Sequence, residues 1–184
     1  ASRFNWETPF ITSSHSNTRL YFGASRLLRS DDRGNTWKPI SPDLTRNESG
    51  RTTAVGSGAE SFGTVFSLAE SPKRGGLLWA GTDDGRVWMT ENDGGEWTEL
   101  TDNLPEPARG QWVSRIEPSH FDANVAYVAT NGYRMGDDRP SILRTVDLGK
   151  TWQSVTGDLP SADPVEVIRE DLVNPKLLYA GTHF

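Results

Sequence analysis

One eight-residue pattern occurs three times in this chain, each time at the end of a strand-like run. The copies are residues 30–37 (SDDRGNTW), 90–97 (TENDGGEW) and 145–152 (TVDLGKTW). The tryptophans that end them are separated by 60 and then 55 residues. This spacing is longer than most helical repeats and close to one four-stranded propeller blade with its loops. The repeat therefore predicts an all-β chain of similar sheets.

Each copy carries the residue types of a tight hairpin turn. In the first copy the hydroxyl residue Ser30 is followed by Asp32 and Gly34 at two-residue intervals. Oxygens of Ser, Thr, Asp and Asn accept hydrogen bonds from turn backbone N–H groups, and Gly adopts a positive φ without strain. We expect the Trp to begin the next strand and to cover the turn. The residues assigned this structural role are Ser30, Asp32, Gly34, Trp37, Thr90, Asn92, Gly94, Trp97, Thr145, Asp147, Gly149 and Trp152.

The pattern resembles the Asp-box, S/T-x-D-x-G-x-T/x-W, of BNR-repeat β-propellers, a superfamily of sialidase-like, xyloglucanase-like and sortilin-type proteins. The first and third copies fit it, whereas the second has Asn92 and Glu96 in place of Asp and Thr. In those families the Asp-box is a peripheral turn, so the resemblance implies a structural role and no ligand contact. Residues 19–45 also resemble large bacterial BNR-repeat proteins described as glycosyl hydrolase-like. The resemblance implies that the chain is a fragment of such a protein.

A second motif, a hydrophobic run that ends in a small residue, occurs four times. The copies are 20–23, 78–81, 126–129 and 178–181, and an aliphatic residue lies about eleven positions before each aromatic, namely Ile11, Leu68, Ile116 and Ile168. Four copies against three turns indicate about three and a half four-stranded blades within one partial β-propeller, 1–184. The predicted blades are 9–41, 62–101 and 111–156, followed by a half blade at 165–184.

Composition and charge exclude several classes of function. The net charge is −6 and the basic residues are scattered, so neither nucleic-acid binding nor membrane insertion is expected. The chain has no Cys, which excludes disulfides and thiolate metal sites, and the Asp-rich turns lack the ligands of a calcium loop. We therefore expect no metal and no cofactor. The family resemblance implies a periplasmic or secreted location.

Loop positions indicate which end of the propeller is free to bind a ligand. In an up-and-down meander with strands A to D, the A–B and C–D turns share one end, and the B–C and D–A connections share the other. The three repeat turns are C–D turns, whereas the long connections 42–61 and 130–141 fall at the opposite end, here named the long-loop face. Binding residues concentrate on such loops. The candidates for ligand binding are Arg51, Tyr133, Arg134, Asp137 and Arg139.

Two functions fit these features. The first is a non-catalytic recognition or scaffold module that binds glycan or peptide on the long-loop face. The alternative, should the chain be an enzyme, is a glycoside hydrolase whose two carboxylates come from different blades, with Glu60, Asp83 and Asp138 as candidates. An incomplete ring leaves unpaired strand edges, so we also expect self-association or docking onto the remainder of the parent propeller.

Overall fold

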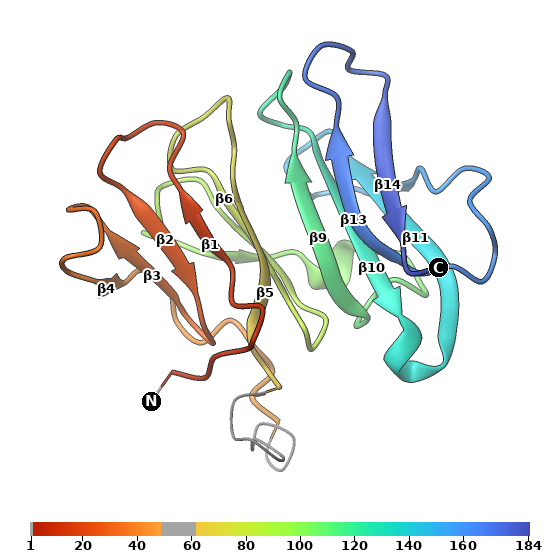
Figure 1. Cartoon of the computed structure of the whole chain (residues 1–184), viewed down its shortest axis with the longest axis horizontal. Helices are drawn as coiled ribbons and strands as arrows, with labels where there is room; N and C mark the ends of the chain where they lie inside the picture. Colours follow the sequence, from red (N-terminus) through yellow and green to blue (C-terminus); the bar gives the residue numbers. More distant parts are fainter. Residues whose placement is uncertain (1, 49–61) are drawn as a thin grey trace.

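The computed structural model describes residues 2–48 and 62–184, which form antiparallel β-sheets with two short 3-10 turns. Three sheets have four strands each, and a fourth sheet has two. Within every sheet the strands pair in the order in which they occur in the sequence. The predicted all-β propeller architecture of about three and a half blades is confirmed (Figure 1).

The strands of the four sheets lie within 10–39, 65–99, 112–154 and 165–182. The first sheet contains β1 (Phe10–Thr12), β2 (Leu20–Gly23), β3 (Leu27–Ser30) and β4 (Lys38–Pro39). The second contains β5 (Val65–Glu70), β6 (Leu78–Thr82), β7 (Val87–Thr90) and β8 (Thr98–Glu99). The third contains β9 (Trp112–Pro118), β10 (Ala126–Gly132), β11 (Asp137–Thr145) and β12 (Gln153–Ser154). The half blade contains β13 (Val165–Glu170) and β14 (Leu178–Thr182), and the 3-10 turns are η1 (Thr101–Asn103) and η2 (Tyr133–Met135).

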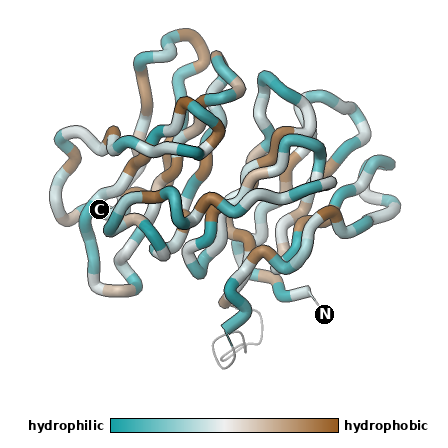
Figure 2. Tube along the Cα trace, turned by 180° about the vertical axis from the view of Figure 1, so that it is seen from behind, coloured by the Kyte–Doolittle hydropathy of each residue, from teal (hydrophilic) through white to brown (hydrophobic). Residues whose placement is uncertain are grey.

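The core consists of three apolar clusters, each between two neighbouring sheets. Tyr21 and Leu68 belong to the cluster between the first and second sheets, Trp79 and Ile116 to the next, and Ile168 to the last. All five side chains are buried. Figure 2 shows the apolar stretches along these strands and mostly hydrophilic residues in the loops. Because side chains alternate across a strand, each sheet buries one face against the preceding sheet and the other against the following one.

Small residues at the end of the second motif let neighbouring sheets approach closely. A Cβ added to Gly81 would lie 2.3 Å from Val113 Cγ1 on the first strand of the next sheet. No side chain fits at that separation, so this copy of the motif ends in Gly because the next sheet occupies the space.

One register differs from the sequence interpretation. Phe10 pairs with Phe22 as Leu68 pairs with Ala80, so Phe10 in the first sheet occupies the position that we assigned to Ile11. Among the aromatic pairs of the described residues, Phe10 contacts only the rings of Phe22 and Trp37 of its own sheet, and no described sheet packs over it. Phe10 is accordingly 55% exposed, whereas Leu68 is 2% exposed.

The three repeat turns are held by hydrogen bonds within each eight-residue segment. In the third turn Thr145 Oγ1 accepts from Gly149 N at 2.8 Å, and Asp147 accepts from Thr151 N at 2.9 Å and from Thr151 Oγ1 at 2.6 Å. Trp152 Nε1 donates to Gly149 O at 3.1 Å and so covers the turn. Gly149 has a φ of 81°, a conformation that glycine adopts without strain.

The second turn shows that an amide can replace the carboxylate. Asn92 Oδ1 accepts from Glu96 N at 2.8 Å, as the Asp of the other two turns does from Thr. Trp97 Nε1 donates to Ile40 O of the preceding sheet at 2.8 Å rather than to its own turn. The turn therefore forms with an amide oxygen as acceptor, whereas the Asp of the first and third turns also accepts a second hydrogen bond, from the Thr hydroxyl.

Two hydrogen bonds from Thr151 lower the pKa of Asp147 from 3.8 to about 2. The bond from the Thr151 side chain has the larger effect, and the bond from its backbone N–H has the next largest. The unfolded chain therefore takes up the proton first as pH falls. The stability contributed by ionised Asp147 is fully present above pH 3.8 and is lost as the pH drops to about 2.

Asp147→Asn keeps the acceptor oxygen but cannot ionise. We expect the melting temperature of this variant to lie below that of the unmodified chain at neutral pH and the difference to shrink as the pH falls from 3.8 to about 2. Calorimetry across this pH range measures the difference. Asp158→Asn, on an exposed turn, is the control. A difference that does not change with pH would contradict the role of the ionised carboxylate.

Candidate functional site

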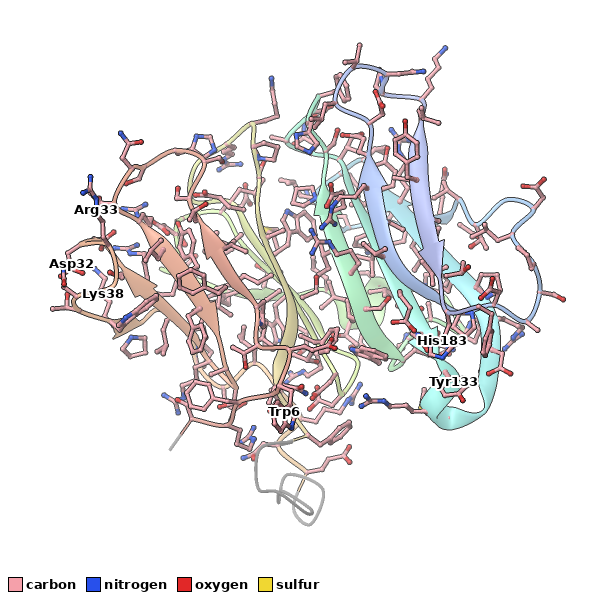
Figure 3. All side chains as sticks on the ribbon, in the orientation of Figure 1. Trp6, Asp32, Arg33, Lys38, Tyr133 and His183 are labelled. Atoms are coloured by element: carbon pink, nitrogen blue, oxygen red, sulfur yellow. The ribbon has the colours of Figure 1, made fainter. Side chains whose placement is uncertain are left out.

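The long-loop face contains a cavity of about 370 Å³, here named the long-loop cavity. The β6–β7 turn, the start of β9 and the β10–β11 connection all contribute to it. Six of the residues that line it are Arg46, Asp83, Asp84, Trp112, Asn131 and Arg134. In Figure 3, Tyr133 and His183 mark this end of the third sheet, and Asp32 of a repeat turn lies far from them at the periphery. Two residues selected from the sequence, Asp83 and Arg134, are thus brought to one cavity.

Asp83 is a buried anchor for the chain that enters the second sheet. Its Oδ1 accepts from Gly63 N at 2.9 Å and Thr64 N at 2.8 Å, and its Oδ2 accepts from Thr64 Oγ1 at 2.8 Å. Asn5 Nδ2 lies 3.4 Å from Oδ2 as well. Burial raises the pKa of Asp83 and outweighs the opposing effect of these hydrogen bonds. Both oxygens are therefore committed to the fold.

Asp84 is also occupied by neighbours in the chain. Its Oδ1 accepts from Thr82 Oγ1 at 2.5 Å, and its Oδ2 accepts from Arg46 N at 2.7 Å. Arg46 Nε donates to Asp84 O at 2.9 Å. The two adjacent carboxylates thus shape the wall of the cavity, and neither has an oxygen without a donor.

Trp112 and Arg134 form the part of the wall best suited to bind a ligand. The Arg134 guanidinium carbon lies 4.8 Å from the centre of the Trp112 ring, and Phe66 meets the same residue edge-on with ring centroids 4.5 Å apart. The buried Trp112 Nε1 has no hydrogen-bond partner among the described residues. A buried N–H without an acceptor costs free energy, and the exposed guanidinium of Arg134 is the polar group of this pair that a ligand can reach.

The other predicted ligand-binding residues do not converge on this cavity. Asp137 accepts from Arg139 Nε and Nη2, both at 2.8 Å, and from Gln111 Nε2 at 3.0 Å. The hydrogen bonds from the Arg139 side chain are the main reason that the pKa of Asp137 is lowered to about 2. Asp137 and Arg139 line a separate cavity of about 390 Å³. Asp138 is exposed on β11.

Tyr133 contacts the end of the half blade. Its ring stacks on His183 with centroids 5.2 Å apart and an interplanar angle of 25°. His183 Nδ1 lies 3.0 Å from Glu166 Oε1. Tyr133 therefore ties the β10–β11 connection to the half blade. Two predicted residues, Arg51 and Glu60, lie outside the described residues.

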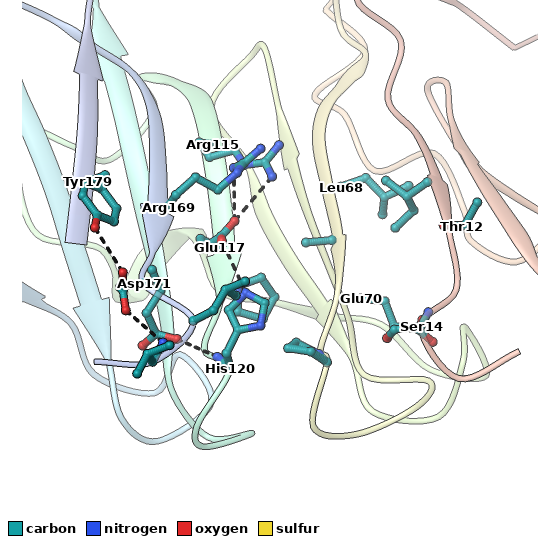
Figure 4. A pocket seen from close by; sticks show the side chains of 17 residues that line it. Thr12, Ser14, Leu68, Glu70, Arg115, Glu117, His120, Arg169, Asp171 and Tyr179 are labelled. Atoms are coloured by element: carbon teal, nitrogen blue, oxygen red, sulfur yellow. Dashed lines mark hydrogen bonds and ion pairs between the residues drawn. The ribbon is translucent and has the colours of Figure 1, made fainter. Parts of the chain in front are cut away.

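A larger groove of about 700 Å³ lies between the first strands of the sheets and was missed by sequence reasoning. Glu117 is its centre: Oε2 lies 3.4 Å from Arg115 Nη2 and 3.2 Å from Arg169 Nη1, and Oε1 lies 3.8 Å from His120 Nε2 (Figure 4). Burial, followed by repulsion from Arg169, lowers the pKa of Arg115. The sequence feature that could have indicated this groove is the pair of charged residues on either side of Ile116, because the rest of that strand has the composition of a buried strand.

No helix among the described residues is long and apolar enough to cross a membrane. Within 2–48 and 62–184, no group of three or more His, Asp and Glu side chains could hold a metal ion.

No protein-family model and no curated protein sequence matches this chain. Solved structures do resemble it. The GH74 xyloglucanase of Xanthomonas campestris superposes with a TM-score of 0.58 and 20% identity over 86% of this chain and 24% of that one. YCF48 bound to D1 peptide superposes with a TM-score of 0.50 and 16% identity over 89% of this chain and 50% of that one. A chain of the COPII outer coat superposes with a TM-score of 0.61 and 16% identity over 98% of this chain and 43% of that one. The chain spans half or less of each, and identities this low show the propeller fold alone.

Removal of the Asp83 carboxylate tests its structural role. Asp83→Ala leaves two backbone N–H groups and one hydroxyl without their acceptor. We expect it to lower the free energy of unfolding by about 2 to 4 kcal/mol, measured by urea denaturation. Asp138→Ala, at an exposed site, is the control and should change it by less than about 0.5 kcal/mol. Equal effects of the two substitutions would contradict the role of Asp83 as an anchor.

Proposed function

We propose that the chain is a non-catalytic recognition module of an extracytoplasmic BNR-repeat protein and that it binds a glycan or peptide in the long-loop cavity. The repeat turns support the BNR assignment because each joins a hydroxyl residue, an Asp or Asn and a Gly by the same side-chain hydrogen bonds. The similar solved structures include both carbohydrate-active enzymes and a peptide-bound propeller. Both ligand classes are therefore compatible with this scaffold.

The observation that carries the proposal is the wall formed by Trp112 and Arg134. It combines an exposed guanidinium with the indole ring on which it stacks. A guanidinium donates to hydroxyl, carbonyl and carboxylate oxygens, which glycans and peptides share. Tyr133 and Met135, at 49% and 62% exposure, add exposed apolar surface on the adjoining η2 turn. A few polar groups among apolar ones are typical of ligand sites.

The carboxylates favour binding over hydrolysis. A glycoside hydrolase needs two carboxyl groups about 5 to 9 Å apart that are free to protonate the leaving group and to attack or activate water. Asp83 and Asp84 are occupied by donors of the fold, and Asp137 is occupied by Arg139 and Gln111. One observation favours the hydrolase alternative: burial raises the pKa of Asp83, as a general acid requires.

Ligand binding can be tested with arrays of glycans, including xyloglucan oligosaccharides, and of peptides. We expect at least one hit, and we expect Arg134→Ala to weaken its affinity by about tenfold or more, as loss of a charged hydrogen-bond donor does. Calorimetric titration of the hit measures the affinity. Asp147→Asn, in a repeat turn, is the matched control and should leave it unchanged. The proposal fails if Arg134→Ala binds as well as the unmodified chain.

The hydrolase alternative has a separate test. We expect the unmodified chain to release no reducing ends from xyloglucan or other plant and bacterial glycans. Should release be observed, its loss in Asp83→Asn with retention in Asp138→Asn would establish the alternative with Asp83 as the acid. Thermal melting of both variants shows whether the loss is one of chemistry or of folding.

A further inference from the structure

Two of the three interfaces between sheets contain the same three-part contact. At the first interface Tyr21 Oη donates to Glu70 Oε1 at 3.3 Å, and Ser14 N donates to Glu70 Oε2 at 3.0 Å. Glu70 ends the first strand of the second sheet, whereas Tyr21 and Ser14 belong to the preceding sheet. The carboxylate therefore joins the two sheets and satisfies a turn N–H at the same time.

The third interface repeats this contact. Tyr127 Oη donates to Glu170 Oε1 at 3.2 Å, and His120 N donates to Glu170 Oε2 at 2.6 Å. The residues are equivalent in register: Glu70 pairs with Leu78 and Glu170 with Leu178. Glu170 is 4% exposed, so these donors replace the water that its carboxylate would otherwise bind. This arrangement of Tyr, turn N–H and Glu is here named the carboxylate clamp.

The second interface lacks all three parts at once. Trp79 stands in place of the Tyr, and its Nε1 has no hydrogen-bond partner among the described residues. Pro72 replaces the residue that donates its N–H, and Pro118 replaces the Glu. Pro has neither an N–H nor an acceptor side chain. Because the three positions come from two sheets and change together, each interface belongs to one of two types.

The half blade presents the donor side of a clamp. Tyr179 occupies the position of Tyr21 and Tyr127, and Leu172 occupies the position of Ser14 and His120. Tyr179 is 54% exposed and Leu172 is 70% exposed. Leu172 N makes no hydrogen bond to any described residue. Figure 2 shows apolar residues in the β13–β14 turn, where Val173 is also exposed.

Among the described residues, the Tyr179 hydroxyl bonds only to the loop of its own half blade. It donates to Asp171 Oδ2 at 3.1 Å (Figure 4). This contact does not exclude a second carboxylate, because Tyr21 Oη lies 3.3 Å from Glu70 and 2.9 Å from Asp93. A tyrosine between two carboxylates therefore already occurs at the first interface.

We propose that the outward face of β13–β14 docks a further β-blade whose first strand carries a carboxylate at the position equivalent to Glu70 and Glu170. The arriving carboxylate accepts from Tyr179 Oη and Leu172 N and completes a third clamp. Apolar contact supplies the area of such an interface, and the clamp supplies specificity, since a blade with Pro at this position leaves two donors unpaired.

An unmodified second copy of this chain does not meet the requirement. The equivalent residue on its first strand is Thr12, which pairs with Leu20 as Glu70 pairs with Leu78. Its Phe10 occupies the apolar position of Leu68 and is exposed. The first sheet thus has the apolar residue that a docking blade needs but not the carboxylate. Thr12→Glu supplies that carboxylate at an exposed site.

The test is sedimentation equilibrium of the full chain carrying Thr12→Glu. We expect head-to-tail association about tenfold tighter than for the unmodified chain, the gain from one carboxylate with two donors. Tyr179→Phe removes one donor and should reverse the gain. Thr12→Gln is the matched control, because Gln has the size of Glu but no charge. It should tighten association less than Thr12→Glu does. Both substituted positions are exposed, so folding, checked by circular dichroism, is expected to be retained.

A mixing experiment fixes the direction of docking. A chain with both Thr12→Glu and Tyr179→Phe has the acid and lacks the tyrosine hydroxyl, so it should associate with itself no more tightly than the unmodified chain does but should bind the unmodified chain about tenfold more tightly, in a one-to-one complex. That result supports the proposal. Either of two results overturns it: Thr12→Glu fails to tighten association, or it tightens association equally in chains that carry Phe at position 179.

Discussion

Each sheet of this protein is covered on both faces only when it lies between two others, and this constraint governs the rest of the structure. A single antiparallel sheet of two to four short strands buries too little surface to be stable alone. The two tryptophans that end well-matched repeats illustrate the point. Trp152 packs against the second sheet and is 9% exposed, whereas Trp37, with the same local turn, has no sheet of the described residues on that side and is 39% exposed. The burial of each tryptophan therefore depends on whether a neighbouring sheet packs against it and not on its own repeat turn.

The interfaces that satisfy this constraint differ in chemistry. The first and third are polar near the inner strands, where a Glu, partly buried at the first interface and buried at the third, accepts from a Tyr and a turn N–H. The second is apolar there, with Trp79 packed edge-on against Trp152 at a centroid distance of 6.3 Å. Apolar contacts tolerate many partners, whereas a buried carboxylate requires its donors. Alternation between the two types therefore distinguishes sheets that share one architecture.

The same scaffold sets the chemistry of the long-loop face. Carboxylates there are placed where they stabilise backbone N–H groups of connections that have no strand partner, as Asp83 does for Gly63 and Thr64. An oxygen used in this way is not available for proton transfer. The groups left for a ligand lie at the start of β9 and on the η2 turn, where the exposed Arg134 guanidinium stacks on the Trp112 ring at the wall of the cavity.

The sequence alone determined the all-β repeat architecture and the positions of the turns, because hydroxyl, Asp or Asn and Gly make their contacts within eight residues of one another. It also selected Asp83 and Arg134. Only the tertiary structure decided that Asp83 is a buried anchor, that Trp112 joins Arg134 in one cavity, and that Asp137 and Arg139 lie in another. Contacts such as Tyr21 with Glu70 join residues 49 positions apart. Such pairs become visible only when the packing of neighbouring sheets sets the register between their strands, and no local periodicity records that packing.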